Sequence, residues 1–546
     1  MARNDNLTDL LRDVAVAIRE KTNSASLINP QDFPERIAAI ETAGGQPEGT
    51  HMVQFIDVDG TILKSQYVAD GGSATPPANP KREKCQFVKW LNAYDNITKD
   101  TDVFALYKSA DGNSWYKVKA NANDRMNLMI RCDTASPVII DWGDGSSDTA
   151  TNRNSYTEFR HDYAEGFDGW VKVSSEGNHR LGSIEADGNP CVIEVVVGGK
   201  VATIGPVAGQ MFNLRSIVIP DTVKECEGYL FYNCLSLLSL VLPDGIKKIS
   251  MNKALFMTDL RYVRLPETLT EIPANMLGYS HSLQSVVIPE SVTSIGDSAF
   301  RDCGSLQSIA IPASVTSIGK SAFQGCYSLQ SIVIPEGVTS IGDSAFRDCG
   351  SLQSIAIPAS VTSIGASAFQ SCANAIFSVN VNNFAPTAAV FMSCRRLTGN
   401  LNIIADEIPH DAFAFTGITS LFCKANKTTR TTGGGAFYGC AELARVELTD
   451  IKEIGSFTFN GCTALSLAII GDTVTKIDSS AFLNCLSLAR LVVKAATPPT
   501  LASDALRGCS KLTAIYVPDE AVEAYKAATN WISYAAKIQP LSSFSE

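Results

Sequence analysis

LQSIAIPASVTSIGKSAFQGCYS, residues 306–328, is the stretch that decides the fold of this chain. The preceding residues, 283–305, read LQSVVIPESVTSIGDSAFRDCGS, and two further copies bring the pattern to residue 372. Three residue types mark a step of 23 residues, at Pro289, Pro312, Pro335 and Pro358, at Phe300, Phe323, Phe346 and Phe369, and at Cys303, Cys326, Cys349 and Cys372. A fixed period in this range is typical of a solenoid, in which each repeat buries its apolar side only by stacking on its neighbours.

A second, longer period lies over the first. The block VTSIGDSAFRDCGSLQSIAIPASVTSIG occurs at residues 292–319 and again, unchanged, at 338–365. A unit of two repeats has therefore been copied as a whole.

Each repeat divides into three short pieces. In LQSIAIP, we expect Leu306, Ile309 and Ile311 to face the core of a short strand, with the residues between them facing outward or at the edge. The strand ends at Pro312, which has no N–H to offer to a ladder. Val315 and Ile318 predict a second inward segment that closes at Gly319. The third piece, AFQGC at 322–326, predicts a tight helical or 3₁₀ turn with Ala322, Phe323 and Cys326 against the core.

The motif IPxxVTxIGxxAFxxC resembles the BspA-type leucine-rich repeat, a family found on surface proteins of gut and oral bacteria. Degenerate copies extend it over roughly residues 190 to 538, so a solenoid with a C-terminal cap is expected at 190–546. About fourteen rungs at the spacing of parallel strands would form a rod of ~65 Å. The expected fold class is mostly β: a leucine-rich-repeat solenoid preceded by small β modules and a short N-terminal helical segment.

Ten of the fifteen cysteines stand at the AFxxC position or a degenerate equivalent of it: Cys234, Cys303, Cys326, Cys349, Cys372, Cys394, Cys440, Cys462, Cys485 and Cys509. No CxxC pair occurs, which argues against a zinc site or a redox motif. We expect these cysteines to be small buried hydrophobic residues with reduced thiols. The rung spacing does not by itself exclude disulfides between coils.

Residues 1–45 are expected to form a helical attachment module. Residues 7–20 place Leu7, Leu11, Val14 and Ile18 on one helical face, and a second short helix follows a break near residues 22–30. The phrase AIREKTNSASLINPQDFPERIAAIE resembles an N-terminal module of tail and other virion-associated proteins of phages that infect gut bacteria. An ordinary helical hairpin is the alternative. Residues 41–50 form a linker.

Residues 51–108 resemble the Listeria–Bacteroides repeat, a small β-grasp module of surface proteins. The resemblance rests on a strand that ends at Gly60, the turn GGSATPP, and the positions of Arg82, Phe87 and Trp90. The sequence departs from the family at 84–85, where Lys-Cys replaces a Gly-aromatic pair. The resemblance implies a spacer or an adhesion unit.

Residues 113–187 resemble a sandwich of the polycystic-kidney-disease (PKD) type, with WGDG (142–145) in a tight hairpin turn and HDYA (161–164) at the start of a later strand. Asp141, Asp144 and Asp148 can be interpreted as a calcium site, but their spacing lacks the EF-hand pattern and its closing Glu. Turn chemistry is the favoured interpretation. His161 is interpreted as a structural hydrogen-bonding residue.

Composition and motifs exclude several functions. The net charge of −11 argues against nucleic acid as a partner, and no apolar stretch is long enough for a transmembrane helix. No HExxH, GxSxG, P-loop or dinucleotide-binding motif in proper context occurs, so we expect neither an enzyme nor a cofactor or metal site. The first fourteen residues lack the basic and apolar regions of a secretory signal.

Three functional classes follow from these observations. The first is a phage virion surface protein, a tail fibre or decoration, whose N-terminal helices contact other virion proteins and whose solenoid binds a glycan or protein of the host surface. The second is a bacterial cell-surface adhesin or a fibre of a contractile injection system. The third, an enzyme, is disfavoured. A missing secretory signal and the tail-like first residues favour the virion surface, reached from the host cytoplasm, over the bacterial cell surface. Homo-oligomerisation stays open.

The expected binding surface is an exposed column of the solenoid: Gln284, Gln307, Gln330 and Gln353, accompanied by Ser285, Ser308, Ser331 and Ser354. These side chains are polar and uncharged, which suits a glycan, a flat protein partner or a solvated spacer. Residues 373–435 keep the Phe and Cys marks but lose the IPxxVT segment, and such departures often map to a binding face or are drift without function. Val522, Tyr525, Trp531 and Tyr534 predict a helix-rich terminal cap.

Overall fold

The computed structural model of this chain describes residues 47 and 49–545, apart from 183–190, 206–210, 228–230, 232–233, 251–254, 256–257, 379–386, 405–407 and 425–430. The predicted N-terminal helices and nearly all of the predicted linker lie outside the described residues. The chain divides into two compact units. The first holds the described residues up to Asp57 with Thr61–Pro80 and Lys89–Ala105, and the second holds Val58–Gly60, Lys81–Val88 and everything from Leu106 onward.

The first unit is built on a four-stranded sheet in the order β2-β1-β4-β3. Its strands are β1 Thr50–Ile56, β2 Ile62–Ala69, β3 Cys85–Leu91 and β4 Thr101–Ser109. Strand β1 pairs antiparallel with β2 and parallel with β4, so the sheet is mixed. Phe55 is fully buried in its core, and the Trp90 ring packs edge-on against it at 5.1 Å between centroids.

Two details of this module differ from or refine the sequence interpretation. The first strand ends at Ile56, and Gly60 lies in the turn that follows, with a positive φ of 87°. A turn forms there because the chain must reverse into β2. Lys84, where the family has glycine, adopts a left-handed φ of 60°. The turn therefore keeps the backbone that glycine favours although the residue differs. Membership in the Listeria–Bacteroides repeat stays a prediction.

The second unit begins with seven strands that form the two layers of a sandwich. They are β5 Ser114–Ala120, β6 Asp124–Cys132, β7 Val138–Asp141, β8 Ser147–Ala150, β9 Thr157–Tyr163, β10 Phe167–Ser174 and β11 His179–Gly182. The predicted hairpin turn at 142–145 is confirmed, because it joins the antiparallel pair β7 and β8. The prediction that HDYA starts a strand is wrong. His161 and Tyr163 lie at the end of β9, which begins at Thr157 and pairs antiparallel with β6.

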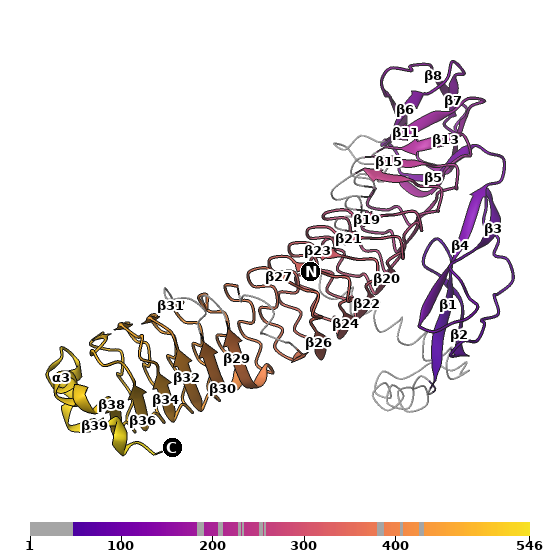
Figure 1. Ribbon diagram of the computed structural model, residues 1–546. Coiled ribbons are helices and arrows are strands. Elements are labelled where there is room, and N and C mark those ends of the chain that lie inside the picture. The colour runs from indigo at the N-terminus through magenta and orange to yellow at the C-terminus, as the bar shows by residue number, and fades with distance from the viewer. Residues whose placement is uncertain are drawn as a thin grey trace, which may run out of the picture. The chain divides into compact units, whose positions relative to one another are not determined.

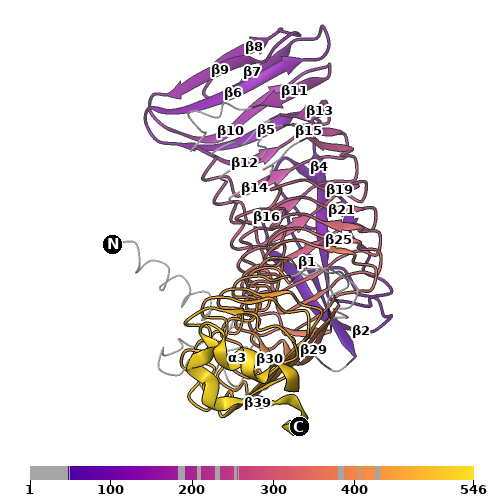
Figure 2. The same cartoon turned by 60° about the vertical axis from the view of Figure 1, so that its left-hand side comes forward.

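Both sheets of the sandwich continue into the solenoid (Figure 2). Strand β12 (Val192–Val196) pairs antiparallel with β5 on one side and parallel with β14 (Ser216–Val218) on the other. In the other layer, β13 (Val201–Ile204) pairs parallel with both β11 and β15 (Glu225–Glu227). The boundary that the sequence analysis places between residues 187 and 190 therefore runs through two continuous sheets. One hydrophobic core extends from Tyr116 to Ile538.

Beyond β15 the chain winds in coils that each add one strand to a broad side and one to a narrow side of the stack (Figure 1). The broad side holds β16 Ser239–Val241, β18 Tyr262–Arg264, β20 Ser285–Val287, β22 Ser308–Ala310, β24 Ser331–Val333, β26 Ser354–Ala356, β28 Ile376–Ser378, β29 Thr398–Ile404, β30 Gly417–Lys424, β32 Arg445–Thr449, β34 Leu467–Ile470, β36 Arg490–Val493, β38 Ala514–Val517 and β39 Ile538–Pro540. The narrow side holds β17 Lys248–Ser250, β19 Glu271–Ile272, β21 Ser294–Ile295, β23 Ser317–Ile318, β25 Ser340–Ile341, β27 Ser363–Ile364, β31 Thr431–Thr432, β33 Glu453–Ile454, β35 Lys476–Ile477 and β37 Thr500–Leu501. The solenoid has about fourteen turns, as expected.

Neighbouring coils pair in parallel and in register with the repeat. Ser308 faces Ser331 and Ile309 faces Ile332, one repeat apart. The predicted inward positions are confirmed: Leu306, Ile309 and Ile311 are buried, as are Val315 and Ile318 on the narrow side. The broad-side strand stops at Ala310, before Pro312, as the missing N–H predicts.

A stack of phenylalanine rings runs through the core. The rings of Phe300, Phe323 and Phe346 lie nearly parallel, with centroids 5.2 and 5.4 Å apart. The stack then continues through Phe369, Phe391, Phe413, Phe437, Phe459 and Phe482. It passes through the irregular stretch 373–435 at Phe391 and Phe413, which confirms that this stretch keeps the Phe mark of the repeat. The outer segment of a coil can therefore change as long as the coil keeps phenylalanine at its core position.

The third piece of each coil is a series of turns closed by i→i−3 hydrogen bonds, such as Gln324 N–H to the Ser321 carbonyl at 3.2 Å, so the predicted 3₁₀-type turn is present but does not extend into a helix. The physical reason is that two residues, four positions apart, adopt left-handed backbone and interrupt any helical run. In one coil these are Ser321 with φ 53° and Gly325 with φ 74°, and in the next they are Ser344 and Asp348 with φ 54° and 61°. Small and turn-forming residues suit these positions because bulky side chains are strained at positive φ.

The cysteines form a second ladder beside the rings. The thiol of Cys326 donates to the backbone carbonyl of Phe300 in the preceding coil at 3.2 Å, and Cys349 does the same to Phe323 at 3.1 Å. The pattern recurs at Cys372, Cys394, Cys440, Cys462, Cys485 and Cys509. All ten cysteines at the AFxxC position are buried, as predicted. Burial raises the pKa of Cys326 to about 12.

In three coils that lack this cysteine, a hydroxyl takes its place. Thr416 occupies the position in the coil of Phe413 and contacts the Cys440 thiol at 3.3 Å. Thr258 and Ser280 occupy it in earlier coils, and their hydroxyls lie 3.1 Å apart. In most coils this position therefore carries a small side chain with a hydrogen to donate, and Met211 occupies it one coil before Cys234.

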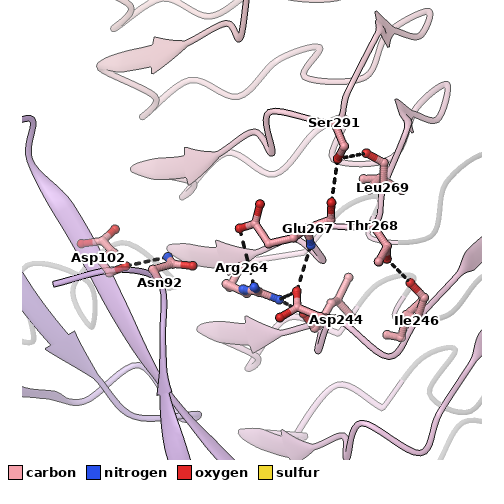
Figure 3. A network of polar contacts seen from close by, with 10 residues as sticks. Asn92, Asp102, Asp244, Ile246, Arg264, Glu267, Thr268, Leu269 and Ser291 are labelled. Atoms are coloured by element: carbon pink, nitrogen blue, oxygen red, sulfur yellow. Dashed lines mark hydrogen bonds and ion pairs between the residues drawn. The ribbon is translucent and has the colours of Figure 1, made fainter. Parts of the chain in front are cut away.

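Polar side chains also join coils at the ends of the broad-side strands. Arg264 pairs with Asp244 of the preceding coil at 2.6 Å, and the backbone N–H of Glu267 donates to the same Asp244 carboxylate at 2.9 Å (Figure 3). In the same network, the Ser291 hydroxyl is 2.7 Å from the carbonyls of both Glu267 and Leu269. These bonds run from coil to coil and so help to fix the stacking register.

The C-terminal cap follows the prediction. The 3₁₀ segment η3 (Asp519–Ala521), helix α3 (Val522–Ala527) and the 3₁₀ segment η4 (Trp531–Lys537) close the last coil. Tyr525 donates to the carbonyl of Ala495 at 2.8 Å, and the Trp531 indole donates to Pro499 at 2.8 Å. Val522 and Tyr534 pack against the same core. The last 3₁₀ turn, η5 (Leu541–Ser543), returns to the outer side of the broad sheet.

Candidate binding surface

The three aspartates of the β7–β8 hairpin serve the turn itself. Asp141 accepts the backbone N–H of Gly143 at 3.0 Å, and Asp148 accepts the Trp142 indole N–H at 2.9 Å. Asp144 accepts both the N–H and the hydroxyl of Ser146. The Ser146 hydroxyl is the main reason why the pKa of Asp144 is lowered.

His161 has the structural role that the sequence suggested. It hydrogen-bonds the Asp144 carboxylate at 2.8 Å, and its ring stacks on Trp142 with centroids 4.7 Å apart. Across the described ranges, no cluster of three or more His, Cys, Asp or Glu side chains has the placement of a metal site. The hairpin is therefore a packed aromatic and carboxylate turn.

The structure places the predicted glutamines on the outside of the broad side. All four, Gln284, Gln307, Gln330 and Gln353, are exposed. The backbone N–H of Gln330 donates to the carbonyl of Gln307 at 2.8 Å, and that of Gln353 donates to Gln330 at 3.0 Å. Three of the four thus stand on directly bonded coils, and Gln284 has the same place one coil earlier.

The neighbouring positions of this surface are small or apolar. Ser308, Ser331 and Ser354 are exposed and face one another along the stack. Val333 is 74% exposed on β24, and Ile376 is 50% exposed on β28. We name the outward residues of the broad-side strands β22, β24, β26 and β28, with the four glutamines, the glutamine face. It is a flat surface of amide and hydroxyl groups with isolated apolar points.

The narrow side carries a different column. Thr293, Thr316, Thr339 and Thr362 are exposed, and each hydroxyl lies 3.1–3.4 Å from the carbonyl of the threonine one coil earlier. Their hydroxyls are thus already engaged within the ladder. Among the residues that the structure describes, the side chains of these glutamines make no such bond to a neighbouring coil, so the two sides differ in what they offer to a partner.

Acidic side chains recur on every second coil because the sequence block is copied in pairs. Glu290 and Glu336 are exposed, with Ala313 on the coil between them. Asp297 and Asp343 are likewise exposed, and the coil between them carries the exposed Lys320 at the same position. Charge therefore borders the glutamine face without entering it, and the face itself suits a neutral, hydrogen-bonding partner.

Sequence reasoning missed one group of exposed side chains. Phe415, Tyr438 and Phe457 stand on three successive coils with 36–45% of their surface exposed. They occupy different positions of their repeats, so the 23-residue period does not mark them. Only the aromatic letters in an otherwise polar turn piece could have drawn attention to them.

Comparisons with known proteins agree with the coil architecture. Residues 189–306, 270–398 and 406–530 match a family model described as the BspA type leucine rich repeat region, in six copies. These ranges together cover more than half of the chain. A search of curated proteins gave no match.

Among solved structures, a leucine-rich repeat protein from Bacteroides ovatus is 20% identical over 67% of this chain and 96% of that chain, with a TM-score of 0.45. A leucine rich cell surface protein from Faecalibacterium prausnitzii is 22% identical over 66% of this chain and 94% of that one, with a TM-score of 0.36. The pneumococcal vaccine antigen PcpA is 16% identical over 52% of this chain and 62% of its own, with a TM-score of 0.29. Among the described residues, no helix combines the length and apolar character that a membrane crossing needs.

Proposed function

This chain belongs to the BspA-type leucine-rich repeat family, and from that premise we propose that it is a non-enzymatic surface-recognition protein that binds its target through the solenoid. The repeat scaffold offers extended surfaces made of many similar coils, a form that proteins use for binding. The target is a glycan or a protein of a bacterial cell surface. Gln284, Gln307, Gln330 and Gln353 are the proposed contact residues.

The observation that carries this proposal is the glutamine face. Its amides are exposed, uncharged and repeated on bonded coils, whereas the threonines of the narrow side are already bonded within their ladder. An exposed amide supplies both a donor and an acceptor at each coil. Such an array can meet the hydroxyl and amide groups of a surface ligand over several coils at once.

Binding of the labelled full chain to a panel of gut bacterial strains, read by flow cytometry, tests the proposal. Lysine at Gln307, Gln330 and Gln353 together should reduce binding by at least roughly 10-fold, because three charged side chains would then occupy the contact. Lysine at Thr316, Thr339 and Thr362 adds the same charge to the narrow side and should leave binding unchanged. Equal loss in both variants, or no strain bound by the unaltered chain, would refute the proposal.

We further propose that the carrier of this protein is a phage particle, with residues 1–45 attached to other virion proteins. The support is the resemblance of these residues to tail-associated modules. The alternative carrier is a bacterial cell surface, where the protein would act as an adhesin or as an injection-system fibre. Homo-oligomerisation of the carrier-bound protein is part of neither proposal.

Deletion of residues 1–45 separates the two carriers. If the particle is the carrier, mass spectrometry of purified particles should find the full chain and not the shortened one, while the shortened chain still folds and binds cells. If the full chain is found on the producing cell's surface and not in particles, the virion proposal is wrong and the adhesin alternative stands.

A further inference from the structure

The turn edge of the solenoid carries an aromatic platform, which we define as Phe415, Tyr438 and Phe457. The three residues belong to successive coils, whose core rings are Phe413, Phe437 and Phe459. Their exposed fractions are 40%, 36% and 45%. Three large aromatic side chains thus face water on successive coils.

Two of the three stand on strained backbone. Phe415 has a φ of 57° and Phe457 a φ of 59°, in the left-handed region that bulky residues rarely adopt. At these two positions, other coils carry small or turn-forming residues: Asp302, Gly325, Asp348, Ser371, Ser393, Gly439, Gly461 and Asn484 at the first, and Ser298, Ser321, Ser344, Ser367, Ala389, Asp411, Gly435 and Ser480 at the second. An aromatic ring here gains no core packing that would offset its strain, and strain of this kind clusters at ligand-binding sites.

Two of the three rings, Phe415 and Tyr438, are held in contact with each other. The Phe415 and Tyr438 rings meet edge to face with centroids 5.1 Å apart, and the Phe415 N–H donates to the Tyr438 carbonyl at 2.7 Å. The Phe415 ring lies over Gly439, since a Cβ added there would be 2.7 Å from two of the ring atoms. Only glycine fits beneath the ring, so the two positions match each other.

Polar groups border the rings on the side of the preceding coil. Asp411 lies against Gly435, whose added Cβ would be 2.5 Å from the Asp411 carboxylate and 3.7 Å from the Tyr438 Cβ. His410 pairs with the same carboxylate at 3.4 Å, and both side chains are exposed. The coil that carries Phe415 therefore also presents an exposed carboxylate and an exposed imidazole.

We propose that this platform binds a sugar ring of a surface glycan. A pyranose has an apolar face of C–H groups that stacks on aromatic rings and an edge of hydroxyl groups that hydrogen-bonds a carboxylate. A protein partner would need about 800 Å² of contact per side, but glycines at 433–435, 439 and 461 limit this patch to three rings. The proposal rests on the surface-recognition function above and names the ligand class for a second site.

The test uses the full chain on a printed array of defined host and bacterial surface glycans. The unaltered chain should bind at least one glycan, and the double variant Phe415→Asn with Phe457→Ser should bind it at least roughly 10-fold more weakly. Both replacements are residue types that other coils carry at positive φ, so the melting temperature should stay equal or rise. Tyr327→Ser, which removes a 58% exposed ring from another coil, should bind as the unaltered chain does.

Three results would overturn the platform: no glycan bound by the unaltered chain, undiminished binding by the double variant, or weaker binding that comes only with a lower melting temperature. The cell-binding assay separates this failure from failure of the proposed function. If the double variant keeps full cell binding while the lysine variant of the glutamine face loses it, the platform is wrong and the surface-recognition function stands.

Discussion

The thiol of Cys372 donates to the backbone carbonyl of Phe346, 3.1 Å away in the preceding coil. The bond joins the two most regular columns of the repeat, because Phe346 itself stacks between Phe323 and Phe369. The same carbonyl also accepts the backbone N–H of Cys349 at 3.3 Å, so the thiol occupies the second acceptor position of a buried carbonyl. This explains why the repeat keeps cysteine instead of alanine at a position that is closed to water.

Thiol reactivity gives the first prediction. The ten cysteines at the AFxxC position are buried, so a thiol reagent should not modify them in the native chain. In denaturant without reductant, all fifteen should react. Cys85, the one that is not buried, serves as the internal control for slow native labelling. Recovery of most of the ten as disulfides would contradict the ladder of reduced thiols.

Alkaline pH should destabilise the solenoid. Burial raises the folded-state pKa of Cys326 and Cys372 to about 12, from an ordinary value of 9.0. Unfolded thiols ionise above about pH 9 while folded ones keep their protons, so the stability of the neutral ladder is complete below that pH and falls as pH rises toward 12. Each buried thiol contributes about 1.4 kcal/mol per pH unit in this window.

Urea unfolding at pH 8 and at higher pH measures this effect. Replacement of Cys326 and Cys372 by alanine should reduce the slope of the unfolding free energy against pH by the contribution of these two thiols. A pH dependence as steep as that of the unaltered chain would show that other groups cause the alkaline loss.

Removal of one core ring tests the stack. Phe346 is fully buried between two parallel neighbours, so Phe346→Ala should lower the free energy of unfolding by about 3–5 kcal/mol. Gln330→Ala changes an exposed residue of the same coil and should stay within about 0.5 kcal/mol of the unaltered chain. Urea unfolding followed by circular dichroism compares the two, and similar losses would contradict the stacked core.

The duplicated block allows a deletion that keeps every contact native. Removal of residues 303–348 joins Asp302 to Cys349, and Asp348 occupies the place of Asp302 in the intact chain. Each new coil contact then copies an existing one, so the shortened chain should fold with a stack shorter by two coils, or ~10 Å. Circular dichroism and small-angle scattering measure both properties.

The matched control for this deletion removes residues 303–314, about half a repeat. It shifts the proline and phenylalanine positions out of register, so polar residues would have to be buried and the melting temperature should fall steeply. If both deletions unfold alike, coil register does not govern this fold.

The buried positions of the solenoid could be predicted from the sequence more completely than the backbone of its turns. The inward positions of one coil, such as Leu306 and Ile309, followed from the period because every copy repeats the same burial. The exposure of Gln307 followed by the same argument. The left-handed pairs, such as Ser321 and Gly325, were missed because serine and glycine suit many turns and carry no periodic apolar signal.

Other features depend on contacts between distant segments. The sequence of β12, VIEVV at Val192–Val196, does not predict that this strand pairs with β5 across the predicted domain boundary. That pairing joins residues some eighty positions apart in the chain. Thr416 was not assigned to the cysteine ladder because its letter differs, although its hydroxyl meets Cys440. Phe415 and Phe457 carried no periodic mark, and only their backbone angles and exposure set them apart.

The bonds between coils run along the stack, as in Thr316 to Thr293 and Thr339 to Thr316. Tension applied between the two ends of the solenoid would therefore load these bonds in series, one coil after another. Each coil that peels away would release about 75 Å of slack chain before the next coil carries the load. We expect a saw-tooth trace in single-molecule pulling, and a single rupture event would contradict this. A receptor-bound solenoid would then lengthen in small steps under tension, one coil at a time, instead of unfolding at once.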